Sequence, residues 1–162
     1  MLFKKNVLLK SSYPIDKLFE RLEATMVFDI KTTDKRKFKG RVDRNTSTFL
    51  ISQSINGFET NSFRPQIKGV ISSDLENHTT LITLNFTLPK SIKVLLVTLL
   101  ILNTTVYIAN IFLNFISINK QALIIAVPIA ALLFLLQMVY FFNTKTSEAI
   151  DDLSFIFGAR EI

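Results

Sequence analysis

The chain of 162 residues contains no cysteine, one histidine and only four glycines. Without cysteine the protein forms neither disulfide bonds nor thiolate metal sites. With His78 as the only histidine, the side chains for a zinc cluster are also missing. We therefore expect no metal site and no cofactor, and the absence of cysteine suits a reducing compartment.

Charged residues are almost absent from residues 92–142. The segment 92–116 carries one charge, at Lys93, and the segment 122–142 carries none. As a helix the first segment would be about 37 Å long, whereas the hydrocarbon core of a bilayer is about 30 Å thick. Because lipid leaves backbone amides without partners, such segments cross a membrane as helices. We predict a transmembrane helical hairpin within residues 91–143.

Basic residues are concentrated before the first apolar segment. Residues 1–93 hold 16 Lys plus Arg against 9 Asp plus Glu, whereas the turn between the segments holds only Lys120. Positively charged flanks stay on the cytosolic side of a membrane. The apolar stretch 7–9 is too short for the core of a signal peptide. We predict a multi-pass protein of the plasma (inner) membrane with both termini in the cytosol.

A helix is predicted to begin at Pro14 and to continue to Met26. Apolar residues recur there at helical spacing, and charged residues occupy the other face. The apolar positions are Ile15, Leu18, Phe19, Leu22 and Met26. Ser11 and Ser12 offer hydroxyl groups for an N-terminal cap. We expect this helix to lie on a sheet.

From Lys37 onward the apolar residues recur at every second position, which is typical of β-strands. The alternating segments are 38–42, 49–55, 63–71 and 82–88, and an earlier strand is expected at 3–10. Turn residues stand near 44–46 and at Asn56-Gly57. Pro65 cannot donate a ladder hydrogen bond, so its strand is expected at an edge or at a bulge. The segments predict a small antiparallel sheet.

A last helix is predicted from about Thr146 to Phe157, capped by Thr144 or Thr146 and ended by Gly158. We expect it to return to the sheet and cover it. The predicted fold is an α+β membrane protein, in which one N-terminal and one C-terminal helix cover the sheet. Its parts are a cytosolic domain in residues 1–90, the hairpin with spans 92–116 and 122–142, and a docking helix in residues 144–162.

Polar residues of the first apolar segment fall on one side of its helix. Asn103, Tyr107, Asn110 and Asn114 are spaced by four, three and four residues. An amide that faces acyl chains is unpaired and costly, so this side should face protein. The second segment offers Ala126, Ala130 and Gln137 as facing positions. We interpret these residues as packing contacts between the helices; the alternative is a pore lining formed by several assembled hairpins.

Lys37, Lys39 and Arg41 belong to a basic stretch, residues 31–44, with seven basic and two acidic residues. Next to a membrane, such residues bind anionic lipid headgroups. The alternative is a solvated face, or an edge strand that lysine protects from aggregation. Nucleic-acid binding is not expected, because no recognised motif is present.

Three strand motifs carry a resemblance to a known kind of protein. They are Phe38-Lys39-Gly40-Arg41-Val42, the stretch from Asn61 to Ile71, and Thr80-Leu81-Ile82-Thr83-Leu84. They resemble an uncharacterised family of small bacterial two-span membrane proteins with F-x-G-x-I and N-S-F-x-P-x-I-x-G-x-I strands. The resemblance implies a cytosolic β-domain followed by two spans and a short helix, and it implies no activity. The junction Asn85-Phe86-Thr87-Leu88-Pro89 departs from the family, in which a basic residue and a histidine follow the last strand.

No set of residues indicates catalysis. His78 has neither a nucleophile nor a carboxylate at a suitable spacing, so we do not expect an enzyme. The sequence favours a non-enzymatic integral membrane protein whose cytosolic domain binds a protein partner or a second copy, or serves as an accessory subunit of a membrane complex. The alternative is a ligand-gated pore-forming or membrane-disrupting effector, for which the class of small-molecule ligand is open.

Overall fold

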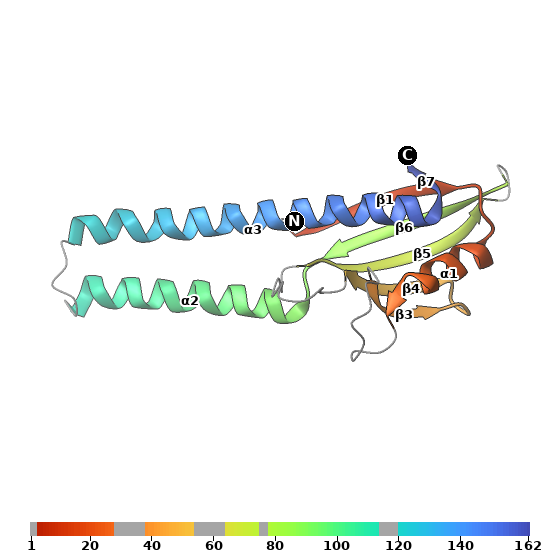
Figure 1. Cartoon of the computed structure of the whole chain (residues 1–162). Helices are drawn as coiled ribbons and strands as arrows, with labels where there is room; N and C mark the ends of the chain where they lie inside the picture. The colour runs from red at the N-terminus through yellow and green to blue at the C-terminus, as the bar shows by residue number, and fades with distance from the viewer. Residues whose placement is uncertain (1–2, 28–37, 54–63, 75–77, 114–119) are drawn as a thin grey trace.

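The computed structural model describes residues 3–27, 38–53, 64–74, 78–113 and 120–162 (Figure 1). For residues 110–113 and 120–125 it describes the backbone alone. This part of the chain is α+β, with one sheet and three helices. Two of the helices are long and apolar, and they extend from one end of the sheet (Figure 1).

The described strands form one sheet in the order β2-β3-β4-β5-β6-β1-β7. Their bounds are β1 Lys4–Ser11, β2 Met26–Val27, β3 Phe38–Asp43, β4 Thr48–Gln53, β5 Gln66–Asp74, β6 Thr79–Thr87 and β7 Ala159–Glu161. Neighbouring strands are antiparallel, except that β2 runs parallel to β3. The predicted antiparallel sheet is therefore confirmed, with two short strands added at its edges.

Alternation in the sequence becomes alternation in burial. In β6 the buried residues are Thr80, Ile82, Leu84 and Phe86, and the intervening side chains are exposed or half-buried. The prediction for Pro65 is wrong, because β5 lies inside the sheet between β4 and β6. The strand begins at Gln66, one residue after Pro65, so the missing N–H interrupts no ladder. The predicted turn at Asn56-Gly57 lies outside the described residues.

The first helix, α1 (Ile15–Ala24), buries Leu18, Phe19 and Leu22. Its N-cap residue is Pro14, and no side chain caps it, so the predicted serine cap is wrong. The Ser11 hydroxyl instead accepts a hydrogen bond of 3.1 Å from the Tyr13 amide. It donates another, of 2.7 Å, to the carbonyl oxygen of Phe157. Ser11 therefore connects the entry of α1 to the last turn of the C-terminal helix.

The two long helices are α2 (Lys90–Leu113) and α3 (Lys120–Phe157). The second predicted span and the predicted terminal helix form this one continuous helix, so the expected break and cap near Thr144 do not exist. A stripe of buried residues explains the continuity, because its members keep helical spacing across residues 143–146. They are Met138, Phe142, Thr146, Ala149, Leu153 and Phe157. The helix ends at Gly158, as predicted, with a left-handed φ of 54°.

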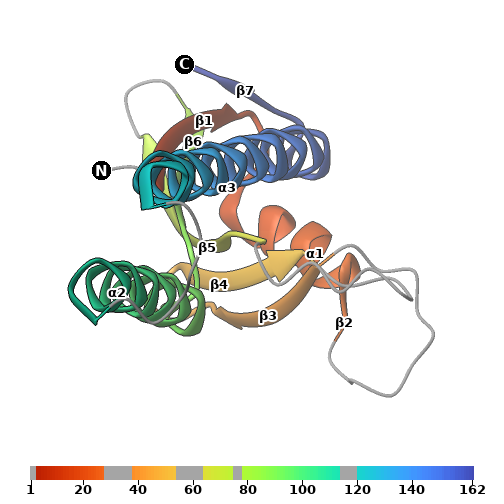
Figure 2. The ribbon, with the colours of Figure 1, turned by 90° about the vertical axis from the view of Figure 1, so that its left-hand side faces the viewer.

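One hydrophobic core joins the sheet, α1 and the C-terminal part of α3 (Figure 2). Both helices lie on the same side of the curved sheet. Strand β7 then pairs with β1, and the Ile162 amide donates a hydrogen bond of 3.1 Å to the Leu8 carbonyl oxygen. The two ends of the described chain therefore meet in one domain. The opposite face of the sheet is covered by no other described element, and below we call it the open face (Figure 2).

Candidate functional site

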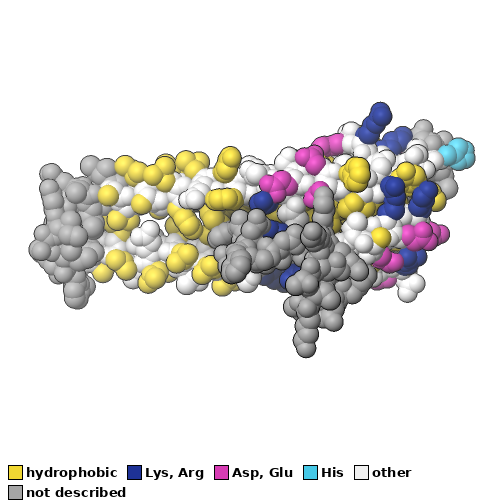
Figure 3. Space-filling view, viewed as in Figure 1, with side chains coloured by type: hydrophobic (Ala, Val, Ile, Leu, Met, Phe, Trp, Pro, Cys, Tyr) yellow, Lys and Arg dark blue, Asp and Glu magenta, His cyan; other side chains and the backbone are white. Residues whose placement is uncertain are grey.

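Both long helices expose apolar side chains on their outer surfaces (Figure 3). Residues Lys90–Ala109 of α2 and Ala126–Phe157 of α3 are long and apolar enough to cross a membrane. Only 6% and 11% of their most apolar windows is buried, whereas the core helix of a water-soluble protein is mostly buried. Contiguous apolar surface of this extent is unfavourable in water. The two helices thus have the exposed surface of membrane-spanning segments.

A hollow of about 280 Å³ lies between α2 and α3, at their sheet end. We call it the interhelical hollow. Its lining includes Phe3, Leu96, Leu100, Asn103, Ala131 and Phe134. The Asn103 amide is its one polar side chain among the described residues. At this level α2 and α3 run side by side, but their side chains do not fill the space between them.

The predicted packing residues take different positions in the structure. Asn103 and Ala130 line the interhelical hollow from opposite helices. Tyr107 is half-buried, and Ala126 and Gln137 are exposed. For Asn110 the structure describes only the backbone, and Asn114 lies outside the described residues. Packing of the spans through this set stays a prediction, and at Asn103 the facing side chains border open space.

Two rows of side chains cross the open face at the end of the sheet nearest the long helices. The register places Lys39, Ser52, Gln66, Thr87 and Lys4 in the first row. It places Arg41, Leu50, Lys68, Asn85 and Asn6 in the second. We call these the basic rows. They hold four exposed basic residues and no acidic one.

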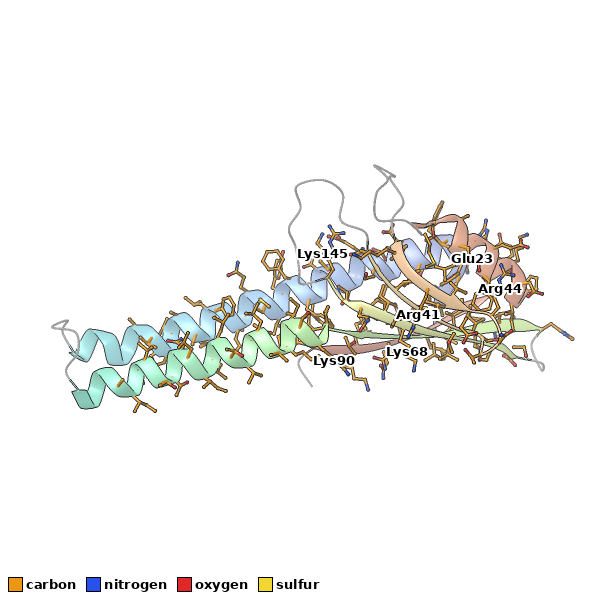
Figure 4. All side chains as sticks on the ribbon, turned by 90° about the horizontal axis from the view of Figure 1, so that it is seen from below. Glu23, Arg41, Arg44, Lys68, Lys90 and Lys145 are labelled. Carbon is orange, nitrogen blue, oxygen red and sulfur yellow. The ribbon has the colours of Figure 1, made fainter. Side chains whose placement is uncertain are left out.

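The basic rows border the apolar helices because the connection from the sheet is very short. Strand β6 ends at Thr87, and α2 begins at Lys90. The first turn of α2 adds Lys90 and Lys93, and Lys68 and Lys90 lie on the same side of the molecule (Figure 4). A cationic zone next to apolar helices is the arrangement that anionic lipid headgroups bind.

Sequence reasoning identified part of this cationic zone. Lys39 and Arg41 lie in the basic rows, whereas Lys37 is outside the described residues. It missed Lys4 and Lys68, which are 64 residues apart in the chain. Only the strand order brings them to one face, because β6 pairs with both β1 and β5.

A second hollow, of about 470 Å³, opens on the same face farther from the apolar helices. Its lining residues are Arg41, Asp43, Thr48, Phe49, Leu50 and Lys68. Asp43 is the acidic residue of this set, and hydrogen bonds from the Thr46 hydroxyl and amide keep its pKa below the usual value. A carboxylate held in its charged form by a turn is a structural feature rather than a proton donor. The lining of this second hollow combines charged, polar and apolar side chains.

The bidentate ion pair of Glu23 and Arg44 joins α1 to the β3–β4 turn. Arg44 donates hydrogen bonds of 3.1 and 2.7 Å to the two carboxylate oxygens. These hydrogen bonds hold the pKa of Glu23 below its usual value, against a smaller opposing effect of burial. The same interaction raises the pKa of Arg44. The pair links α1 to this turn at the surface, whereas the buried residues Leu18, Phe19 and Leu22 hold the helix on the sheet.

Among the described residues, no group of three or more His, Cys, Asp or Glu side chains could hold a metal ion. No family model, no curated protein and no solved structure matches the chain. The resemblance of the strand motifs to a two-span family therefore stays a prediction.

Proposed function

We propose that the protein is a non-enzymatic integral protein of the plasma (inner) membrane whose cytosolic domain binds a protein partner, as an accessory subunit of a membrane complex. The observation that carries this proposal is the open face of the sheet, which stands directly beside two exposed apolar helices. One face of an antiparallel sheet can remain solvated, so the composition of the open face decides between solvent and a partner.

Rigid connections support a docking role for the open face. Residues Leu88, Ile92 and Phe142, which stand at the junction with the helices, belong to the same core as the sheet. The Phe3 and Phe142 rings meet edge to face, with 5.8 Å between their centres. Because both helices continue into this core, the open face keeps a fixed height and direction relative to the bilayer.

The composition of the open face supports a protein partner. It carries apolar side chains among polar ones: Leu8, Leu50 and Leu81 are half-buried, and Val70 is 40% exposed. Around them stand the basic side chains of Lys39, Arg41 and Lys68, and Asp43 lies at the end of the row that contains Val70. Interfaces of soluble partners combine an apolar centre with a polar rim. A partner with an acidic rim fits this surface best.

The cytosolic position of the domain is supported by charge and by topology. The excess of basic residues lies before α2, and such residues stay on the cytosolic side. Strand β7 at the C-terminus pairs with β1 at the N-terminus, so both ends belong on the same side of the membrane. Two spans, an even number, agree with this arrangement.

Site-specific photocrosslinking in native membranes tests the proposal. A photoreactive amino acid at Val70 samples the open face, and one at Phe155, which is 85% exposed on α3, serves as the matched control. We expect one discrete adduct from Val70, lost in the variant Lys68→Glu, and none from Phe155. Equal adducts from both positions, or none from Val70, would contradict partner binding at the open face. An adduct of twice the protomer mass would identify a homo-oligomer.

Asn103 favours a second candidate, the pore-forming effector. Its side chain is exposed in the middle of an apolar helix and borders the interhelical hollow. Polar side chains at such positions mark water-filled or partner-filled space. If several hairpins assemble into a pore, overexpression is toxic, and Asn103→Leu removes the toxicity while Thr104→Leu does not. Harmless overexpression would exclude this candidate.

A further inference from the structure

Resting on the proposed membrane integration, we propose that the first basic row and the start of α2 form a binding surface for anionic lipid headgroups of the cytosolic leaflet. Its lysines are Lys4 and Lys39 in the row and Lys90 and Lys93 on α2. The rest of the open face, around Val70, is left to the partner of the proposed function.

The sheet and α2 hold the four lysines in one zone. All four side chains are exposed. Lys4 and Lys39 stand at opposite ends of the first row, four strand spacings or about 19 Å apart, and β6 leads into α2 between them. Lys93 follows Lys90 by three residues, so the two share one side of α2. Lys90 lies on the same side of the molecule as Lys68, which belongs to the open face (Figure 4).

The first row lies close to the bilayer surface. Helix α2 carries no charge after Lys93, and a lysine is unfavourable in hydrocarbon, so Lys93 marks the edge of the hydrocarbon core. From Thr87 to Lys90 the chain spans at most about 10 Å, and the turn from Lys90 to Lys93 adds about 5 Å. The headgroup layer occupies about 5 to 7 Å of this distance. The backbone of the first row is therefore about 8 to 10 Å from the headgroups, near the screening length of about 8 Å at physiological salt.

Distance also separates the first row from the second. The second row lies two residues, or about 7 Å, farther from the bilayer, which is nearly a second screening length. In addition, each lysine carries its charge at the end of a flexible four-carbon chain, which brings the charges of the first row closer to the leaflet. The first row therefore contributes most of the attraction that the sheet exerts on headgroups.

The distribution of charge on the open face favours anionic headgroups at its membrane end. In the rows farther from the helices, basic and acidic residues balance; they are Lys10, Arg160, Asp43 and Asp74. The described parts of β1, β6 and α2 contain no Asp or Glu. The described ion pairs involve none of the four lysines. Zwitterionic headgroups carry no net charge to offset them, so anionic headgroups are preferred.

Position favours lipid over a protein partner at this end of the face. Wherever the helices span a bilayer, its headgroups surround the start of α2. A soluble partner would have to displace those headgroups to reach Lys90 and Lys93. Lipid is therefore the nearer source of negative charge for this surface.

Fluorescence quenching in reconstituted vesicles tests the inference. Because the chain has no cysteine, one fluorophore is attached through Ser52→Cys in the first row, or through Ser72→Cys in a farther row as the control. The vesicles contain phosphatidylcholine alone or an equal mixture with phosphatidylglycerol, with the same fraction of a nitroxide headgroup quencher. Attraction should make quenching of the Ser52 label about twofold stronger in the mixture. This excess should vanish at about 1 M salt, where the screening length is about 3 Å, and the Ser72 label should show none.

Two double variants remove equal charge from the open face. Lys4→Gln/Lys39→Gln should abolish the excess quenching of the Ser52 label. Lys10→Gln/Arg160→Gln, in a farther row of the same face, should leave it unchanged. Equal quenching in the two kinds of vesicle, or equal effects of the two variants, would overturn the inference. Quenching that follows protein density instead of phosphatidylglycerol would also overturn it, and would show that a second copy covers the row.

Failure of the membrane proposal itself is seen in a separate experiment. Alkaline extraction of native membranes removes peripheral proteins and leaves integral ones in the pellet. A protein that stays in the pellet but shows no effect of phosphatidylglycerol would refute only the headgroup surface. A protein released into the supernatant would refute the proposed membrane integration.

Discussion

The guanidinium of Arg21 in α1 donates a hydrogen bond of 2.9 Å to the carbonyl oxygen of Ile156, in the last turn of α3. It also lies 4.5 Å from the centre of the Tyr13 ring. Carbonyl groups in the last turn of a helix have no partner within that helix, and a cation there is favourable. Arg21 therefore holds the end of the long helix against the short one.

Replacing Arg21 by methionine should lower the free energy of unfolding by about 1 to 2 kcal/mol, because a charged hydrogen bond to a helix end is lost. Lys17→Met is the matched control. The Lys17 ammonium also lies over the Tyr13 ring, at 4.6 Å, but it does not reach the helix end. Thermal unfolding of the purified protein, followed by circular dichroism in one detergent, measures both. Equal losses would show that the Ile156 contact contributes nothing.

Gly69 lies so close to a neighbouring ring that the packing leaves no room for any side chain. A Cβ atom built there would overlap the ring of Phe49 on the neighbouring strand. Gly69→Ala should therefore destabilise the domain by about 1 to 3 kcal/mol. In the Phe49→Leu background the same substitution should cost much less, and a double-mutant cycle measures the difference. An unchanged cost would mean that the strain lies in the backbone.

Thr146 is fully buried, and its hydroxyl has no hydrogen-bond partner among the described residues. Thr146→Val keeps the shape and removes an unsatisfied group, so stability should rise by about 1 kcal/mol. Thr80→Val is the opposite case, because the buried Thr80 hydroxyl donates a hydrogen bond of 2.7 Å to the Tyr13 carbonyl oxygen. That variant should lose about 1 kcal/mol. Chemical denaturation of the two variants should give shifts of opposite sign, and shifts of the same sign would refute the assignment.

The pair of Glu23 and Arg44 predicts a dependence of stability on acid pH. The pKa of Glu23 is lower in the folded protein than its usual value of 4.5. Its stabilising effect is therefore complete above that value and is lost as the pH falls through the folded-state pKa. Glu23→Gln should remove this part of the pH dependence, and Arg44→Gln should remove the same part. Melting temperatures between pH 3 and 6 test this; a wild-type slope retained in either variant would contradict it.

Much of the fold was predictable because its signals are local. The alternation in residues 38–42 and 82–88 predicts β3 and β6, and the long uncharged segments predict α2 and most of α3. The helix end at Gly158 also follows from one residue type. These features depend on neighbours in the chain, which the sequence displays directly.

The remaining features depend on contacts between distant residues. The predicted cap at Thr144 implies a break in the helix, but burial of Phe142 and Thr146 on one side of it keeps the helix continuous. Strands β2 and β7 have two and three residues, too few for a periodic pattern. Lys4 joins Lys68 on the open face only because β6 pairs with both β1 and β5, so the sequence alone could not bring these two residues together.

The absence of cysteine allows the most direct test of the central claim, that α2 and α3 cross the membrane and hold the domain on the cytosolic side. Single cysteines are introduced at Gln121, between the spans, and at Ser72, on the exposed surface of β5. Intact cells are then treated with a membrane-impermeant maleimide. We predict that Gln121→Cys is labelled in intact cells and that Ser72→Cys is labelled only after lysis. Labelling of Ser72→Cys in intact cells, or recovery of the protein in the soluble fraction, would contradict the account.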